Sequence, residues 1–221
     1  MSDALPRPRR LVRRGVQLAV GLVLYGVSSA LVVASGLGLG PWNVLHEGLA
    51  ERTGLSIGVV TTLTGALVLL LWIPLRQRPG LGTLCNVLVV GLAMDTTLAL
   101  LPGVRALAVR VVSLVAGIVL DGAATGLYIA AGFGPGPRDG LMTGLHRRTG
   151  RSIRLMRTAV EVTVVVTGFL LGGTVGAGTV LYAVSIGPLA QLFLRLFAVR
   201  ESPSGTRAVA PPSPERVILH P

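Results

Sequence analysis

Six stretches of the chain are long and apolar enough to cross a lipid bilayer. They lie at residues 15–35, 56–75, 80–101, 107–131, 153–173 and 176–197. A helix needs about 20 apolar residues to cross the hydrocarbon core, where it satisfies its own backbone hydrogen bonds. Only 13% of the residues are charged, whereas soluble domains carry about 25%. We therefore expect an all-α, polytopic membrane protein with six transmembrane helices.

The first apolar stretch has the basic start and apolar centre that a secretory signal peptide also has. It reads RPRRLVRRGVQLAVGLVLYG. Its apolar part is long, however, and residues 110–131 resemble it at a place where no cleavage could follow. We therefore interpret it as a retained first span.

A sequence repeat divides the chain into two halves. Residues 36–58, GLGLGPWNVLHEGLAERTGLSIG, return 96 residues later as residues 132–154, GFGPGPRDGLMTGLHRRTGRSIR, with 12 of the 23 positions identical. The same offset relates residues 14–101 to residues 110–197 without a gap, which indicates an internal duplication. Each half holds three spans, so the second must enter the membrane from the opposite side. The fold expected is two inverted three-helix repeats.

Four segments follow from this division. We expect a cytoplasmic N-terminal tail at 1–14, a first three-span repeat at 15–101, a second at 108–197 and a disordered cytoplasmic tail at 198–221. The last segment has five prolines and little apolar content, which favours disorder.

All 20 basic residues are arginines, and the formal net charge is +11. With the N-terminus inside, 17 of them lie on the cytoplasmic side, and Arg52, Arg105 and Arg110 are the three outside. This bias predicts a multi-pass protein of the bacterial cell membrane with both termini in the cytoplasm. It also explains why only the second copy of the repeated stretch is strongly basic. Because the arginines adjoin apolar runs and aromatic residues are few, we expect no nucleic acid partner.

The repeated stretch predicts a short helix in each half. Proline suits the first helical turn and glycine the position just after a helix, so the helices should run from Pro41 to Gly54 and from Pro137 to Gly150. About 12 residues are too few to span, and Ser56 and Ser152 can cap the spans that follow. Each short helix is either an amphipathic connector in the interface or a re-entrant gate that lines a substrate path. The residues of this candidate gate or interfacial motif are Gly40, Pro41, Trp42, Asn43, Pro137, Arg138 and Asp139.

Three segments resemble the YczE/YyaS/YitT family of bacterial integral membrane proteins. They are GLGPWNVLHEGLAERTGLSIG, GPRDGLMTGLHRRTGRSI and the stretch from Glu161 through LLGGTVGAGTVLYAVSIGPLAQ. The resemblance implies a polytopic helical protein of the cell membrane, and it implies neither a particular activity nor catalytic residues. One departure is an extra Gly134-Pro135 ahead of Gly136-Pro137, which offers an alternative start, one turn earlier, for the inner short helix.

Three carboxylates lie within the predicted spans, where a charge costs roughly 2.5–3.5 kcal/mol at the bilayer centre. At 1.5 Å per residue, Asp121 and Glu161 lie about 15 and 12 Å from the inner ends of their spans, and Asp95 lies nearer the outer end. They are candidate midplane or transport residues, with a pair that responds to protons or cations as one hypothesis. The alternatives are an ion pair of Glu161 with Arg157, one helical turn away on the same face, and hydrogen bonds from Asp95 and Asp121 to neighbouring helices.

Other site chemistry is sparse in this sequence. The single Cys85 and the histidines, which we expect at the interface, form no metal set, so we expect no metal, no cofactor and no enzyme. The functional hypotheses are a small secondary transporter or permease of unknown solute and a membrane accessory protein that supports another complex. The expected partners are the lipid bilayer and a small solute or membrane protein. The oligomeric state is not indicated.

Overall fold

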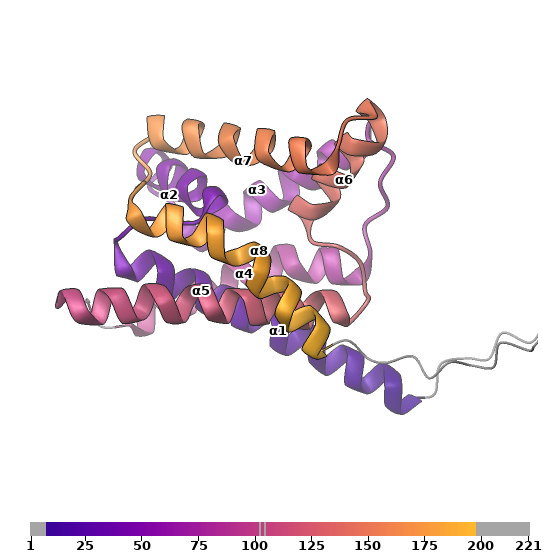
Figure 1. The fold of residues 1–221 in the computed structure, drawn as a ribbon, viewed down its shortest axis with the longest axis horizontal. Helices are drawn as coiled ribbons and strands as arrows, with labels where there is room; N and C mark the ends of the chain where they lie inside the picture. The colour runs from indigo at the N-terminus through magenta and orange to yellow at the C-terminus, as the bar shows by residue number, and fades with distance from the viewer. Residues whose placement is uncertain (1–7, 102, 104, 198–221) are drawn as a thin grey trace, which may run out of the picture.

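The computed structural model describes residues 8–101, 103 and 105–197. These residues form eight α-helices, which confirms the all-α class. The helices are α1 (Pro8–Ser35), α2 (Pro41–Thr53), α3 (Ile57–Trp72), α4 (Leu81–Leu100), α5 (Leu107–Ala130), α6 (Pro137–Thr149), α7 (Ile153–Leu170) and α8 (Ala177–Phe197) (Figure 1). The tail predicted at 198–221 lies outside the described residues.

Several of these helices are suited to a membrane. Within the described residues α1, α4, α5 and α8 are long and apolar enough to cross one, and α2 with α3 adds a fifth span if this pair, bent by 113°, is counted as one. Helix α3 has only 16 residues, and α7 carries Arg154, Arg157 and Glu161. The multi-pass helical protein is confirmed, while the count of six spans stays a prediction.

The first helix begins earlier than expected. It starts at Pro8, inside the predicted tail of residues 1–14. Arginine is a good helix former, and a long basic side chain can keep its charge in water while its stem covers apolar surface. The basic segment therefore continues the helix instead of ending it.

The two short helices have the predicted bounds. Both begin at a proline, and each ends at a glycine in the left-handed region, Gly54 at φ +72° and Gly150 at φ +68°. The inner one begins at Pro137, so the extra Gly134-Pro135 does not start a helix. A residue with a Cβ would be strained at either glycine, which explains why both helices stop there.

Serine caps begin the helices that follow. The Ser56 hydroxyl accepts a hydrogen bond from the Val59 N–H, and that of Ser152 accepts one from the Leu155 N–H, as predicted. Such a bond satisfies one of the N–H groups that a helix start leaves unpaired. The end of α2 and the start of α3 are therefore marked locally, by a glycine and then a serine.

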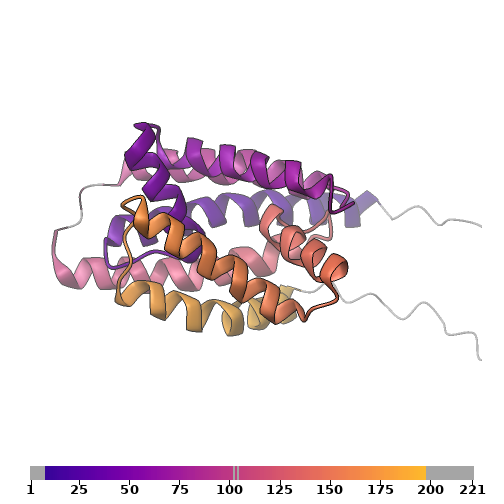
Figure 2. The ribbon, with the colours of Figure 1, turned by 90° about the horizontal axis from the view of Figure 1, so that it is seen from above.

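The helices form two layers in which the long helices run lengthwise along the molecule, whereas α2 is bent away from α3 by 113° (Figures 1 and 2). In the lower layer of Figure 1, α1 packs against α4 and α5, and α5 packs against α8. In the upper layer α2 packs against α7 and α3 against α6, and α3 also packs against α4. One buried cluster consists of Val32, Leu39, Val44, Leu114 and Ile118, and another of Trp42, Val68, Trp72, Leu141 and Val164.

The outward faces of the long helices are apolar. Leu67 on α3, Leu92 on α4 and Val184 on α8 are among the many exposed large aliphatic side chains. A soluble protein rarely exposes contiguous apolar surface on this scale. These outward faces are suited to contact with lipid, in agreement with the apolar spans.

Arginine caps join the two halves reciprocally. The Arg110 guanidinium donates to the carbonyl oxygens of residues 35 and 36, at 2.6 and 2.7 Å. Its counterpart 96 positions earlier, Arg14, donates to those of residues 131 and 132, at 2.7 and 3.1 Å. Each arginine thus satisfies the last carbonyls of the other half's first helix, which have no partner within the helix.

Backbone contacts between the halves are reciprocal as well. The Gly178 N–H donates to the Leu37 carbonyl at 2.9 Å, and the Gly82 N–H donates to the Phe133 carbonyl at the same distance. Gly82 and Gly178 are 96 residues apart, as are Leu37 and Phe133. The same approach of a loop to a helix start therefore occurs twice.

Candidate functional site

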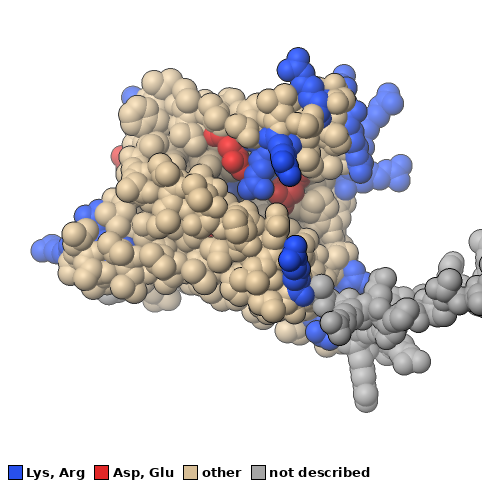
Figure 3. Space-filling view, in the orientation of Figure 1, with Lys and Arg blue, Asp and Glu red and all other residues tan. Residues whose placement is uncertain are grey.

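A cavity of about 290 Å³ lies between the two layers. Polar and charged side chains line it, among them Asn43, His46, Arg138, Asp139, Arg157 and Glu161. In the space-filling view, acidic and basic side chains gather in a hollow between the two ends of the molecule, and further basic side chains stand at the ends (Figure 3). Charged side chains within membrane segments are rare and costly, and those that occur almost always face the protein interior or a cavity such as this one.

The first turns of α2 and α6 form one wall of the cavity. Gly40 to Asn43 contribute from α2, and Gly136 to Asp139 contribute from α6. The start of a helix has unpaired N–H groups and a partial positive charge. The cavity therefore receives the positive ends of two helices. All seven residues of the motif predicted from the sequence lie here, brought together from the two halves.

Close packing holds these two turns in place. A Cβ on Gly40 would lie 2.9 Å from the Tyr182 ring, so only glycine admits this tyrosine beside the start of α2. The Trp72 indole N–H donates to the Pro137 carbonyl at 3.0 Å and ties the start of α6 to α3. Both turns are therefore positioned by neighbouring helices.

Arg138 has no carboxylate partner in the cavity. Its guanidinium carbon lies 5.0 Å from the centre of the Trp42 ring, a cation–π distance. One N–H group donates to the Tyr25 hydroxyl at 3.4 Å. The neighbouring Asp139 accepts a 2.7 Å hydrogen bond from the Tyr128 hydroxyl. The only ion pair among the described residues does not involve Arg138 and is formed by two side chains of α7.

That ion pair joins Arg157 and Glu161. The Arg157 Nε–H donates to Glu161 Oε1 at 2.9 Å, and the two side chains are 50% and 28% exposed. Both line the cavity. Glu161 therefore has the cationic partner that the sequence analysis gave as the alternative to a free carboxylate, while its depth in the membrane stays a prediction.

The other two candidate carboxylates do not line this cavity. Asp121 on α5 is 2% exposed and accepts a hydrogen bond from the hydroxyl of Tyr182, which does line it. Asp95 on α4 accepts hydrogen bonds from the Ser56 hydroxyl and from the Gly58 N–H, at 2.8 Å for the latter. The structure therefore brings only Glu161 to the cavity, and it gives Asp95 a capping contact at the start of α3.

His46 is the residue that sequence reasoning misplaced. It was expected at the membrane interface, but it is 1% exposed and lines the cavity. Its Nδ1 lies 2.9 Å from the Thr61 hydroxyl oxygen, and this hydroxyl donates to the Ile57 carbonyl. The hydroxyl then accepts from Nδ1–H, which leaves Nε2 as an acceptor in the neutral ring. The expectation was wrong because α2 turns inward, which its composition does not indicate.

The cavity tyrosines were also missed by the sequence analysis. Tyr25, Tyr128 and Tyr182 line it from three different long helices. Their only sequence signal is that they are the three tyrosines of the chain and lie well inside apolar spans. Among the described residues, no group of three or more His, Cys, Asp or Glu side chains converges in a way that could hold a metal ion.

Comparison with known proteins places this architecture in a family. Residues 12–195 match the model of a family of unknown function, DUF6198. The chain belongs to this family. An uncharacterized protein of Haemophilus influenzae is 44% identical over 82% of the chain and 83% of its own length. The uncharacterized membrane protein YczE of Bacillus subtilis is 30% identical over 84% and 87%, respectively.

More distant relatives agree with this assignment. The uncharacterized protein YyaS of Bacillus subtilis is 27% identical over 79% of the chain and 89% of its own length. The resemblance to YczE and YyaS drawn from the repeated stretch is therefore confirmed. No solved structure matches the chain.

Proposed function

We propose that this chain is a small secondary transporter that moves a small solute through the cavity between its two halves. The observation that carries the proposal is the cavity itself, with an ion pair and an unpaired arginine inside a helical membrane protein. A structural core would fill this space with apolar side chains. Intramembrane ionisable groups facing a cavity are characteristic of substrate and ion paths.

The two halves are proposed to be inverted repeats of three spans each. Support comes from the reciprocal contacts of Arg14 and Arg110, because a two-fold axis makes each contact occur twice with the roles of the halves exchanged. Three spans per half carry the chain to the other side, so the second half runs the opposite way. In this arrangement α3 and α7 are the short middle spans, and α2 and α6 are re-entrant.

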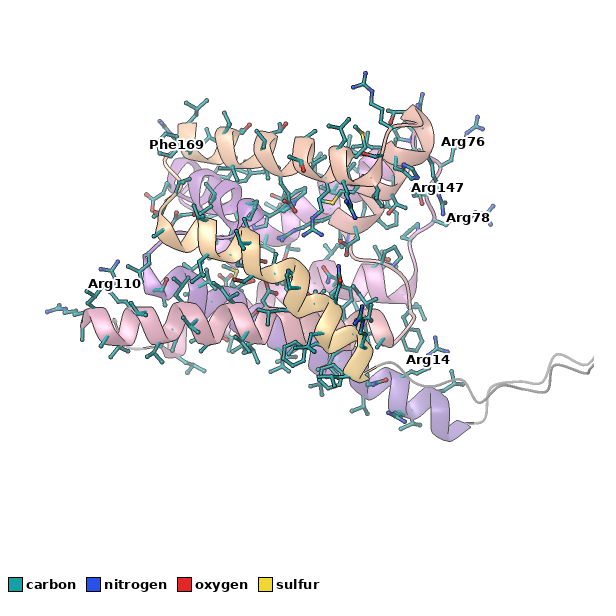
Figure 4. All side chains as sticks on the ribbon, in the orientation of Figure 1. Arg14, Arg76, Arg78, Arg110, Arg147 and Phe169 are labelled. Carbon is teal, nitrogen blue, oxygen red and sulfur yellow. The ribbon has the colours of Figure 1, made fainter. Side chains whose placement is uncertain are left out.

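The arginines favour a cytoplasmic N-terminus. In Figure 4, Arg14, Arg76, Arg78 and Arg147 lie at one end of the molecule and Arg110 at the other. Cytoplasmic ends of membrane proteins carry the excess of basic residues. The end at which α1 begins and α8 terminates is therefore assigned to the cytoplasm (Figures 1 and 2).

The two halves differ in the contact between their last two long helices, which is α3 with α4 in the first half and α7 with α8 in the second; we call this contact the seam. Gly58 on α3 lies so close to Gly91 on α4 that a Cβ on either would overlap the other's backbone. The corresponding helices α7 and α8 are not packed together, and a Cβ on Gly187 would have no neighbour within 4 Å. One closed and one open seam are what a single state of an alternating-access transporter presents.

Exchange of the two arrangements would move the opening from one seam to the other. Arg154 stands where Gly58 stands in the first half, so α7 and α8 cannot approach as closely as α3 and α4. In the second state, the α7–α8 contact would therefore close at a wider spacing than the α3–α4 contact, with Arg154 beside it.

Flux into proteoliposomes tests the transport proposal. Radiolabelled acetate, phosphate and alanine serve as probes, with Gly187→Trp as the blocking variant. A tryptophan there should fill the open seam and abolish saturable uptake, whereas Gly15→Trp, which also points into open space, should leave it intact. Absence of saturable flux for all three probes with folded protein would reject transport of these solute classes and favour the alternative.

The alternative is a membrane accessory protein without transport of its own. Its supporting observation is the group of exposed arginines around the end of α6, Arg147, Arg148, Arg151 and Arg154. Such a group attracts an acidic protein surface or anionic lipid. Recovery of one stoichiometric protein partner, lost in an Arg147→Gln, Arg148→Gln double variant, would support this role.

A further inference from the structure

We propose that the cavity binds a small oxyanion, a carboxylate or phosphate group, between the first turns of α2 and α6, with Arg138 as its counter-ion. The role of this anion as the transported solute rests on the proposed function. The binding site itself rests on the geometry of the cavity and can be tested separately.

Arg138 supplies the positive charge of the site. Its fork of five N–H donors has one long hydrogen bond, to the Tyr25 hydroxyl, and no carboxylate within ion-pair distance. A guanidinium binds carboxylate or phosphate through two parallel hydrogen bonds. An unpaired, half-buried arginine in a membrane protein is costly, and a bound oxyanion removes that cost.

The two helix starts add to the same potential. Both α2 and α6 have 13 residues, and each has unpaired N–H groups in its first turn. Proline occupies the first position of both, which leaves the N–H groups of Trp42, Asn43, Arg138 and Asp139 as the nearest donors. The positive end of a helix dipole favours anions, and it does so more strongly where the site is partly buried.

An unsatisfied donor beside these turns points to a missing acceptor. Trp42 is 7% exposed, and its indole N–H has no hydrogen-bond partner among the described residues. Buried polar groups are almost always paired, and an anion accepts hydrogen bonds from such a donor. The side chain of Asn43 is 6% exposed and lines the cavity, where its amide N–H groups are available as further donors.

The acidic groups around the cavity are already engaged. Glu161 is paired with Arg157, and Asp139 accepts from Tyr128. Asp139 is also exposed, so water screens its charge more than that of the half-buried Arg138. The formal charges of these four ionisable groups cancel, so the positive charge that would attract an anion is that of Arg138 together with the two helix starts.

The size and the opening of the cavity limit the ligand. At about 290 Å³ it lies at the lower end of the roughly 300–1,000 Å³ typical of ligand pockets, which favours a small ion. The open seam between α7 and α8 admits either a free solute or the phosphate of a lipid headgroup. Both sources share the oxyanion chemistry.

Iodide quenching of tryptophan fluorescence tests the site in purified protein. Iodide should quench a saturable fraction of the fluorescence that Trp42→Phe removes, while neutral acrylamide should not saturate. Trp72, which is 2% exposed, supplies a constant background. Acetate, phosphate and dioctanoyl phosphatidic acid are then added as competitors at constant ionic strength.

The competitors separate the two sources. Competition by acetate or phosphate supports a free oxyanion, and competition by the phosphatidic acid alone supports a lipid headgroup. Arg138→Gln should weaken competition at least tenfold. Arg138→Lys, which keeps the charge but loses the fork, should weaken it less. Arg147→Gln, on the exposed part of the same helix, should have no effect.

Two results would overturn the oxyanion site. One is the absence of competition by all three compounds, and the other is equal binding by the Arg138→Gln and Arg147→Gln variants when light scattering shows that both unfold at the wild-type temperature. Oxyanion binding without flux would reject transport and retain the site. Saturable flux of radiolabelled glycerol, a neutral solute added as a fourth probe, without oxyanion competition would do the reverse.

Discussion

Trp42 and Arg138 occupy counterpart positions, 96 residues apart, and they stack on each other with the guanidinium carbon 5.0 Å from the ring centre. Two residues separated by the repeat offset can be in contact only at the boundary between the two halves of the chain. An aromatic ring in one half and a cation in the other make this meeting point asymmetric. The same position of the duplicated sequence thus supplies the aromatic ring in the first half and the cation that stacks on it in the second.

The reciprocal arginine caps should contribute measurably to stability. Arg110→Gln removes two charged hydrogen bonds to the end of α1, and charge-assisted bonds contribute about 1.5–3 kcal/mol each when well buried. Because Arg110 is partly solvated, we expect a loss of about 1–3 kcal/mol and a lower unfolding temperature in detergent. Arg105→Gln is the matched control, since Arg105 is exposed and its side chain makes no hydrogen bond to the described residues. Equal unfolding temperatures for the two variants would contradict the capping role.

Two glycine-to-alanine changes should have opposite effects. A Cβ on Gly140 would overlap the buried Trp72 indole, so Gly140→Ala should cost about 3 kcal/mol or prevent accumulation of folded protein. A Cβ on Gly187 meets nothing within 4 Å. Gly187→Ala should be neutral or stabilise by up to about 1 kcal/mol, because alanine loses less entropy in a helix. Thermal unfolding and the yield of monodisperse protein measure both, and a tolerated Gly140→Ala would contradict the packing around α6.

Counterpart positions should face opposite sides of the membrane. Single cysteines at Glu51 and Arg147, which are 96 residues apart and both exposed, are placed in a Cys85→Ser background. An impermeant thiol reagent added outside intact cells should label only the first, and labelling of the second should require disruption of the membrane. Equal labelling from outside would exclude the inverted arrangement.

The ion pair on α7 should tune the affinity for anions. Glu161→Gln frees the Arg157 charge in the cavity and should strengthen phosphate competition by roughly fivefold, about 1 kcal/mol. Arg157→Gln should weaken it by a similar factor, since it leaves a carboxylate facing the ligand. The double change restores a neutral pair and should return the affinity close to that of the unchanged protein. Shifts of the same sign in both single variants would exclude an electrostatic role for the pair.

The helix framework followed from local features of the sequence. The long apolar runs predicted where the long helices lie, and proline, glycine and serine at Pro41, Gly54 and Ser56 predicted the ends of a short helix and the start of the next. These features act within one turn of the chain, so a residue pattern is enough to recognise them. The repeat needed no structure either, because the offset of 96 is visible in the residues themselves.

The contents of the cavity were decided only by tertiary packing. Depth along a helix placed Asp121 and Glu161 at a similar level, but depth leaves the rotation of a helix about its axis undetermined. Packing of α5 against α1 and α8 turns Asp121 toward Tyr182, while α7 turns Glu161 into the cavity. The 113° bend after α2 is what buries His46. Rotation and bending depend on contacts between residues far apart in the chain, so a local pattern determines the helices but not which side chains they bring together.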